Sequence, residues 1–402
     1  MIPIDKTTDL RFRIDKVQFA AFLGLMTMGV LFIYSATLAH EANDIPWYRE
    51  RYVMQIVFYL AGLSVAFVLC LVDYHALSRW SFIGYWLIVV LLLAVLIPGI
   101  GVKRFGARRW FDLGFFQLQP SEFAKLAFIM AQAHFLSRPM DELRLPRNFF
   151  KAIGLMALPF LLILKEPDLG SALVILPVGL VMMYAAGVPV KFLRRLLLGV
   201  GVVVGLFLIE ILYAPPQWQF KLEDYQRRRL WVYFGRDYAA GLAKEAEKDK
   251  ARFQQRNDSY NVRQALISVG SGGLTGKGWC KGTQNALGFL PRAVAHNDFI
   301  FSVIAEEKGF MGSVSVLALY SVVLFTGIRI AGQTRDRLGK LLAVGVVTLW
   351  FSHVFINIGM NIRIMPVTGV PLPLLSYGGS SVLSSLIAAG ILQNVYIHRR
   401  SF

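Results

Sequence analysis

Hydrophobic residues form long runs along almost the whole chain, and polar residues are largely confined to the segments between them. Most runs approach the roughly 20 residues that an α-helix needs to cross the hydrocarbon core of a bilayer. The pattern therefore predicts an all-α polytopic membrane protein with ten transmembrane helices. The predicted spans are residues 17–39, 52–72, 80–97, 123–136, 150–164, 171–186, 193–213, 310–330, 341–358 and 382–397.

The composition agrees with lipid as the main solvent of the chain. Hydrophobic residues make up 56% of the 402 residues, charged residues only 17%, and the mean hydropathy is +0.54. Soluble domains contain fewer apolar and more charged residues. We therefore expect one membrane domain over residues 1–402. Cys70 in a span and Cys280 in a polar loop predict neither a disulfide framework nor a metal site.

The basic residues predict the orientation of the chain. The short segments on one side hold 18 Lys or Arg, and those on the other side hold eight. Positively charged short loops resist translocation, so both termini are expected in the cytoplasm. The first run, 17–39, is too long for a signal-peptide core and is interpreted as an uncleaved span. The net charge of +17 is scattered over loops, so nucleic-acid binding is not predicted.

One connection is much longer than the others. Residues 214–297 are predicted to form a large extracytoplasmic loop between the seventh and eighth spans, with 14 basic and seven acidic side chains. The segment GLAKEAEKDKARFQQR within it favours a solvated or interfacial helix, and a polar spacer explains the same composition. Residues 268–278, SVGSGGLTGKG, fail the phosphate-loop pattern, because Ser271 and Gly278 stand where that pattern needs Gly and Ser or Thr.

Charged residues also occur at the outer ends of the predicted spans. Glu122 and Lys125 are three residues apart and share a helix face, either as an inward-facing pair or as a pair that snorkels to the interface. Lys165 lies in LKEPDLGSAL, where Pro, Asp and Gly predict a structural turn. Arg363 and Ser380 lie in the last outer connection, where Ser380 can cap a helix or help hold an anion.

The stretch HNDFIFSVIAEE, residues 296–307, places Asp298 before seven uncharged residues and Glu306 after them. One helix from Asp298 to Ile330 would be about 50 Å long, well beyond the ~30 Å of hydrocarbon, so a break near Gly309 or Gly312 is expected. Asp298 is then either a helix N-cap or a functional acid.

Together these groups predict a mixed-charge cleft with apolar walls at the outer face. Its members would be Arg109, Glu122, Lys125, Lys165, Asp298, Glu306 and Arg363. Such a cleft suits an amphiphile with an anionic headgroup, because cations hold phosphate. A carboxylate that is partly removed from water can accept a proton.

Five stretches in this order closely resemble the SEDS family of shape, elongation, division and sporulation proteins, and the resemblance covers all ten spans. They are ARRWFDLGFFQLQPSEFAK, EPDLGSAL, SVGSGGLTGKGWCKGTQNALGFLP, HNDFIFSVIAEEKGFMG and NIGMNIRIMPVTGVPLPLLSYGGSS. The chain differs from the family in having Asn297 where Thr is common. Its charged stretch 237–258 also looks longer than usual, which leaves partner contacts there open.

The resemblance implies an inverting glycosyltransferase that polymerises lipid II into peptidoglycan, with undecaprenyl pyrophosphate-linked glycan as the donor. It implies that Asp298 is the essential acid, that Trp110, Glu122 and Lys125 are functional, and that a class B penicillin-binding protein is the partner. We hypothesise that Asp298 is the general base for the acceptor hydroxyl. Arg109, Lys125, Lys165, Arg363 or a divalent cation, Mg²⁺ or Mn²⁺, would then stabilise the leaving pyrophosphate. No tightly bound cofactor is expected.

Two other functions stay open at this point. A flippase or transporter of lipid-linked precursors is also built from many helices, but it needs a polar route through both leaflets, and the inner halves of these spans offer little beyond Gln132, His134 and His353. A scaffold for a penicillin-binding protein has the long outer loop as its only direct support.

Overall fold

The structure is a computed structural model that describes residues 14–38, 46–104, 107–114, 116–213, 231, 233–235, 259–290 and 294–399. Each of the ten predicted spans coincides with a helix. The helices are α1 Lys16–Leu38, α2 Arg51–Leu71, α3 Tyr74–Arg79, α4 Ser81–Leu96, α5 Pro120–Leu136, α6 Met140–Leu143, α7 Pro146–Lys165, α8 Leu169–Ala185, α9 Val190–Tyr213, α12 Thr283–Ala286, α13 Ile300–Gln333, α14 Arg337–Asn361 and α15 Gly379–His398. The fold is thus the expected all-α polytopic one.

Seven of these helices are long and apolar enough to cross a membrane: α1, α2, α7, α9, α13, α14 and α15. Helices α4 and α8 are apolar but have only 16 and 17 residues, and α5 also has 17. The exact number of membrane crossings therefore stays a prediction.

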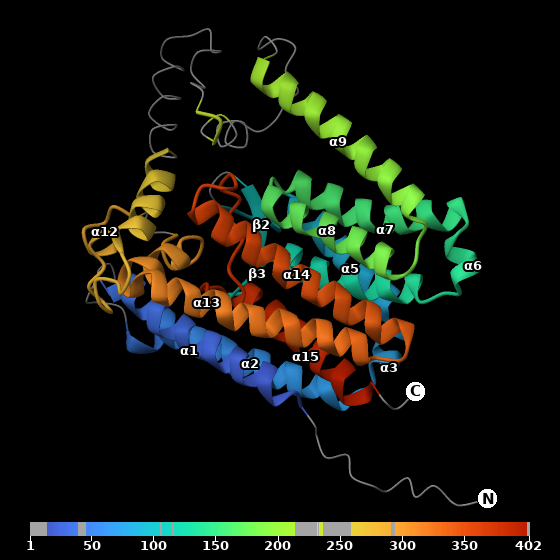
Figure 1. The fold of residues 1–402 in the computed structure, drawn as a ribbon, viewed down its shortest axis with the longest axis horizontal. Coiled ribbons are helices and arrows are strands. Elements are labelled where there is room, and N and C mark those ends of the chain that lie inside the picture. The colour runs from blue at the N-terminus through green and yellow to red at the C-terminus, as the bar shows by residue number, and fades with distance from the viewer. Residues whose placement is uncertain are drawn as a thin grey trace, which may run out of the picture.

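The helices pack mainly side by side, with α14 and α15 innermost. Figure 1 shows the axes of α1, α2, α13, α14 and α15 roughly aligned with one another, and α2 packs along α15 and α1 along α13. In the most apolar window of α14, 72% of the residues are buried, compared with 6% in α9. Figure 1 accordingly shows α9 standing apart from the other long helices.

The expected break in α13 occurs at Gly309, where the backbone has φ 65° and ψ −157° inside an otherwise helical segment. A break leaves backbone groups without helical partners. Residues 272–278 satisfy them: the amides of Phe310 and Met311 donate to carbonyls of Gly273 and Leu274 at 2.8 and 3.1 Å. Residues 272–278, part of the glycine-rich stretch that failed the phosphate-loop pattern, therefore bridge the α13 break with backbone hydrogen bonds and form what we call the splint.

The sequence analysis did not predict a small antiparallel sheet between α4 and α5. Its strands are β1 Val102–Arg104, β2 Ala107–Asp112 and β3 Gln117–Leu118, in the order β1-β2-β3. Phe111 pairs with Leu118. The sheet matters for the site because β2 carries Arg109 and Trp110, and β3 leads directly into α5.

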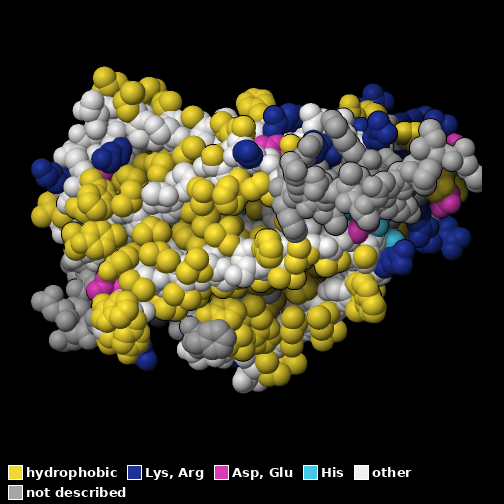
Figure 2. Space-filling model, turned by 90° about the horizontal axis from the view of Figure 1, so that it is seen from below, with side chains coloured by type: hydrophobic (Ala, Val, Ile, Leu, Met, Phe, Trp, Pro, Cys, Tyr) yellow, Lys and Arg dark blue, Asp and Glu magenta, His cyan; other side chains and the backbone are white. Residues whose placement is uncertain are grey.

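The surface is consistent with a chain that lies in lipid. Figure 2 shows hydrophobic side chains over much of the face seen from below, with Lys and Arg densest toward the end where Figure 1 places α3 and α6. Within the predicted outer loop, residues 259–271 are helical and α12 follows them. The charged stretch 237–258 lies outside the described residues, so the helix predicted there stays untested.

Candidate active site

Glu122 and Lys125 form a buried ion pair near the start of α5. Lys125 Nζ lies 2.7 Å from Glu122 Oε1, and both side chains are only 2% exposed. Pro120 at the start of the helix places Glu122 in its first turn, where the helix dipole favours an anion. Ser384 of α15 donates to Glu122 Oε2 at 3.2 Å. Of the two expected arrangements, the pair adopts the inward-facing one.

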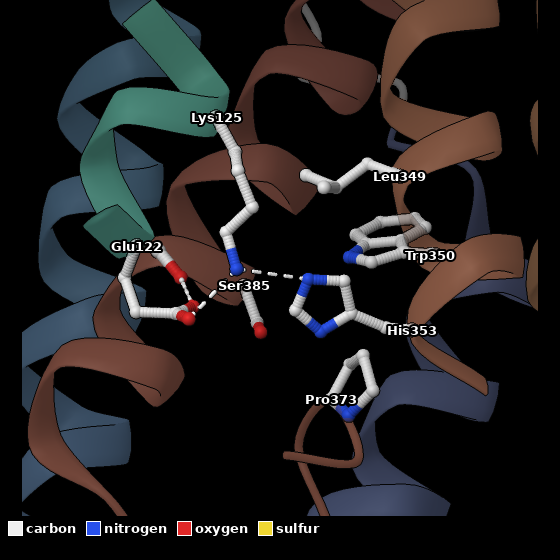
Figure 3. A pocket seen from close by; sticks show the side chains of 8 residues that line it. Glu122, Lys125, Leu349, Trp350, His353, Pro373 and Ser385 are labelled. Carbon is white, nitrogen blue, oxygen red and sulfur yellow. Dashed lines mark hydrogen bonds and ion pairs between the residues drawn. The ribbon is translucent and has the colours of Figure 1, made fainter. Parts of the chain in front are cut away.

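A third polar group joins this pair from α14. Lys125 Nζ lies 3.0 Å from His353 Nε2, and His353 Nδ1 lies 3.2 Å from the carbonyl oxygen of Pro371. Figure 3 shows Lys125 reaching down between Glu122 and His353, which converge on it from opposite sides. The ammonium group is therefore held by two buried side chains.

A small cavity of about 10 Å³ adjoins the ion pair, lined by Glu122, Lys125, Leu349, Trp350, His353, Pro373, Ser384 and Ser385 (Figure 3). This volume holds about one water molecule. The indole Nε1 of Trp350 is buried without a hydrogen-bond partner among the described residues. The cavity is far too small for a sugar ring, so it is not the substrate site.

The N-terminal ends of α5, α8 and α15 are joined by a second polar network. Asp168 caps α8 by accepting from the amide of Ser171 at 3.1 Å, and Gln119 Nε2 donates to its other oxygen at 3.1 Å. Ser380 accepts from the amide of Gln119 at 2.9 Å and donates to the carbonyl of Gln117 at 2.8 Å. Asp168 and Ser380 thus hold the entry to α5, and the turn expected at 165–170 is present.

Arg109 on β2 is fastened to this turn. Its Nε donates to the carbonyl of Glu166 at 3.0 Å, and its Nη2 donates to the carbonyl of Pro167. The guanidinium also lies 6.0 Å from the ring of the neighbouring Trp110, which is partly exposed. Arg109 therefore fastens strand β2, which also carries Trp110, to the α7–α8 turn.

Glu166, in the α7–α8 turn, has the most unusual surroundings of the carboxyl groups near Arg109. Its side chain is fully buried, and neither oxygen has a hydrogen-bond partner among the described residues. The pKa of Glu166 is raised to about 9, mainly by burial and also by the negative charge of Asp168, while the positive charge of Arg109 lowers it. Glu166 is consequently protonated at neutral pH.

Asp298 lies one residue before the N-cap of α13, which is Phe299. It is partly buried, and a methyl group on Gly369 would stand 3.5 Å from its Oδ2. Its backbone carbonyl accepts from Asn357 Nδ2 at 3.2 Å and from Asn361 Nδ2 at 3.0 Å. Asp298 is thus placed between the start of α13, α14 and the loop that carries Gly369.

The residues just before Asp298 are tied to the chain that enters α15. Tyr377 donates its amide to the carbonyl of His296 at 3.0 Å, and Ser376 Oγ donates to the carbonyl of Asn297 at 2.6 Å. The His296 and Tyr377 rings pack edge to face, 5.5 Å apart. The backbone around Asp298 is therefore fixed on both sides, which suits a residue that must meet a substrate at a set position.

The remaining predicted site residues lie in different surroundings. Lys165 at the end of α7 and Arg363 after α14 are exposed. Glu306 is fully buried, and its Oε1 accepts from Lys277 at 2.7 Å, from Thr283 at 3.1 Å and from the Gln284 amide at 2.9 Å. The structure thus joins Glu122 with Lys125, and Ser380 with the start of α5. Glu306 lies apart from them, on α13, where it binds the splint through Lys277.

A resident metal has no ready site among the described residues, because no three His, Cys, Asp or Glu side chains converge there. Divalent cations such as Mg²⁺ need several oxygen ligands, which a lone Asp298 does not supply. We therefore assign no chemical step to a protein-bound metal, and metal dependence stays a prediction.

Three polar residues of α14 contact the site's backbone, of which the sequence analysis named only His353, as a polar group in the inner half of a span, and not as part of the site. His353, Asn357 and Asn361 follow one another at four-residue intervals along α14 and are all buried. Residues four apart share one helix face, so this spacing in an otherwise apolar helix was the available signal.

Comparisons with known proteins place this polytopic all-α chain in a family. The FtsW/RodA/SpoVE family model, described as "Cell cycle protein", matches residues 15–401. The chain is 35% identical to the peptidoglycan glycosyltransferase MrdB of Escherichia coli (strain K12) over 398 residues, covering 99% of this chain and 97% of that protein. It is 33% identical to the peptidoglycan glycosyltransferase RodA of Treponema pallidum (strain Nichols), covering 95% and 97%.

Solved structures agree with this result. A chain of a peptidoglycan synthase complex that coordinates polymerization and crosslinking matches with a TM-score of 0.74 and 26% identity, over 97% of this chain and 99% of that chain. The rod shape determining protein RodA of Thermus thermophilus matches with a TM-score of 0.65 and 26% identity, over 96% and 98%. The chain belongs to the FtsW/RodA/SpoVE family, the SEDS family that its motifs indicated.

Proposed function

We propose that this protein is a peptidoglycan glycosyltransferase that polymerises lipid II into glycan strands during cell elongation. The observation that carries the proposal is the setting of Asp298, a partly buried carboxylate at a helix start. Asn357 and Asn361 hold its backbone carbonyl, and Ser376 holds that of the preceding Asn297. Membership of a family whose relatives are named peptidoglycan glycosyltransferases supports the reaction class.

In the proposed reaction, Asp298 accepts the proton of the acceptor sugar's 4-hydroxyl while that oxygen attacks the anomeric carbon of the lipid-linked donor chain. The bond between the anomeric carbon and the donor's pyrophosphate breaks, and undecaprenyl pyrophosphate leaves with the bonding electrons. One displacement inverts the anomeric centre. This route needs a single essential carboxylate, unlike the paired acids of retaining glycosidases.

The cations divide into two groups in this proposal. Lys125 is 2% exposed and engaged with Glu122 and His353, and Arg109 binds two backbone carbonyls. These two residues shape the site. Lys165 and Arg363 are exposed, so they are assigned to the developing charge on the pyrophosphate. Trp110 on β2 is assigned to packing against the sugar or lipid.

We further propose that the chain lies in the inner membrane with both termini in the cytoplasm and Asp298 on the extracytoplasmic side. The excess of Lys and Arg in the short segments assigned to the cytoplasm supports this orientation. A class B penicillin-binding protein is the proposed partner, supported by the likeness to a chain of a peptidoglycan synthase complex.

A reconstituted assay tests the function directly. Purified protein in liposomes receives fluorescent lipid II, and the same preparation is followed for glycan strands by gel electrophoresis and for headgroup translocation by quenching with a membrane-impermeant reagent. The proposal predicts strands without translocation. Translocation without strands would instead establish the flippase. A scaffold would be established if this protein alone showed neither activity and a penicillin-binding protein alone made the strands.

A further inference from the structure

Three polar side chains form a ladder on one face of α14. His353, Asn357 and Asn361 are 4%, 0% and 0% exposed, and each stands one helical turn after the last. Burying polar groups in an apolar bundle is unfavourable unless they are hydrogen-bonded. Their partners therefore indicate what the ladder is for.

Each of the three side chains contacts the backbone of Asp298 or of the loop just after Gly369. His353 contacts the carbonyl of Pro371, as described above. Asn357 Nδ2 donates to the carbonyl of Val370 at 2.8 Å as well as to that of Asp298. Asn361 Nδ2 donates to the carbonyl of Asp298. The ladder thus holds Val370, Pro371 and Asp298 against one helix.

The tautomer of His353 follows from its two neighbours. A protonated lysine has only donors, so His353 Nε2 must accept from Lys125 Nζ at 3.0 Å. A neutral imidazole that accepts at Nε2 carries its proton at Nδ1, which donates to the Pro371 carbonyl at 3.2 Å. The imidazole therefore joins the buried ion pair to the loop that faces Asp298.

We propose that His353 is a positioning residue: Lys125 anchors its ring at Nε2, and the decisive hydrogen bond from Nδ1 to the Pro371 carbonyl holds the loop that carries Gly369 and so fixes Asp298 for proton transfer. This inference rests on the proposed function, because it assumes that Asp298 is the base. Neither His353 nor Lys125 touches the substrate in this account, and Lys125 acts through His353 rather than on the pyrophosphate.

Substitutions of His353 test its hydrogen bonds to Lys125 and to Pro371 separately. The amide of an Asn side chain falls near the place of Nδ1 and keeps the donor to Pro371. The amide of a Gln falls near Nε2 and keeps only the acceptor for Lys125. Phe keeps the ring but neither bond. Ser352→Ala is the matched control, because Ser352 Oγ donates only within α14, to the Thr348 carbonyl.

The experiment measures kcat and KM for lipid II polymerisation, together with thermal unfolding, for these four variants and Asp298→Asn. His353→Phe is expected to lower kcat about tenfold or more with little change in KM, because small displacements of a catalytic group are costly. His353→Asn should recover most of the lost kcat and His353→Gln should not. Ser352→Ala should match the parent protein.

The possible outcomes distinguish a failure of this inference from a failure of the proposed function. Full kcat in folded His353→Phe, a Gln variant as active as the Asn variant, or losses that only follow the folded fraction would each overturn the positioning role. Should His353→Phe not fold, the ranking of Asn above Gln decides the matter. If Asp298→Asn abolishes polymerisation while the His353 variants are normal, only this inference fails. If Asp298→Asn is active, the assignment of Asp298 as the base fails, and if the parent protein forms no strands, the proposed function fails.

Discussion

Gly369 faces the carboxylate of Asp298, and a side chain at this position would begin 3.5 Å from Oδ2. The backbone of Gly369 has φ 76°, which residues with a Cβ rarely adopt. Glycine here therefore meets two demands together: it allows the turn in the connection between α14 and α15, and it leaves room beside the proposed base.

Gly369→Ala should reduce polymerisation more than it reduces stability. The strained backbone costs about 1–2 kcal/mol, and the added methyl displaces the Asp298 carboxylate from the acceptor hydroxyl. Activity per folded molecule and thermal unfolding are measured together. Gly154→Ala is the control, because a Cβ there meets nothing within 4 Å and α7 favours Ala over Gly. Equal activity in the two variants would contradict the account.

Lys125→Met should destabilise the protein strongly. It leaves the Glu122 carboxylate buried at 2% exposure without its cation, and breaking a buried pair in this way costs about 3–5 kcal/mol. The double variant Glu122→Gln with Lys125→Met removes both charges and should regain much of the loss. Denaturant unfolding in detergent checks this. A double variant no more stable than the single one would show that the pair is not buried as described.

Glu306→Gln should act on stability and not on substrate binding. Glu306 Oε1 accepts one hydrogen bond from Lys277 in the splint and two from Thr283 and Gln284 beyond it, and weakening them costs about 1–3 kcal/mol. KM for lipid II should stay within about twofold of the parent value, because no substrate contact is removed. Exposed Glu142→Gln is the control. A large rise in KM with unchanged stability would restore the original assignment of Glu306 to substrate binding.

Glu166 predicts a specific dependence of stability on pH. Its pKa is raised from 4.5 to about 9 in the folded protein, so between these values the folded chain keeps a proton that the unfolded chain has released. Stability then falls as pH rises through this window, by at most about 1.4 kcal/mol per pH unit. Glu166→Gln removes this dependence and should be increasingly more stable than the parent from pH 5.5 to 7.5.

Thermal unfolding of both proteins at several pH values checks the Glu166 prediction. The informative quantity is the difference between variant and parent, because other groups titrate equally in both. A difference that does not grow with pH would mean that Glu166 is ionised in the folded protein, paired with Arg109.

The helices were predictable because burial in lipid demands long apolar runs, and each predicted span has its helix. The α13 break was predictable as well, because an unbroken helix would exceed the bilayer and Gly309 is the residue that tolerates φ 65°. The β1–β3 sheet was not predictable, because its strands have two to six residues and little periodicity.

Within the site, the sequence predicted contacts between residues of one helix but not contacts between distant segments. The three-residue spacing of Glu122 and Lys125 predicted their pairing. Nothing in the sequence placed His353 beside Lys125, 228 positions away, or Glu306 against Lys277 across a glycine-rich loop. Those partners are fixed by helix packing, which a single sequence does not reveal.

The central claim is that Asp298 is the base for glycan polymerisation, and one comparison tests it most directly. Purified Asp298→Asn and parent protein are given fluorescent lipid II under identical conditions, with Asp141→Asn, an exposed carboxylate on α6, as the control for a lost charge. Asp298→Asn should be folded, as judged by thermal unfolding, and should form no glycan strands, whereas Asp141→Asn forms them normally. Strands made by Asp298→Asn at a rate near that of the parent would contradict the account.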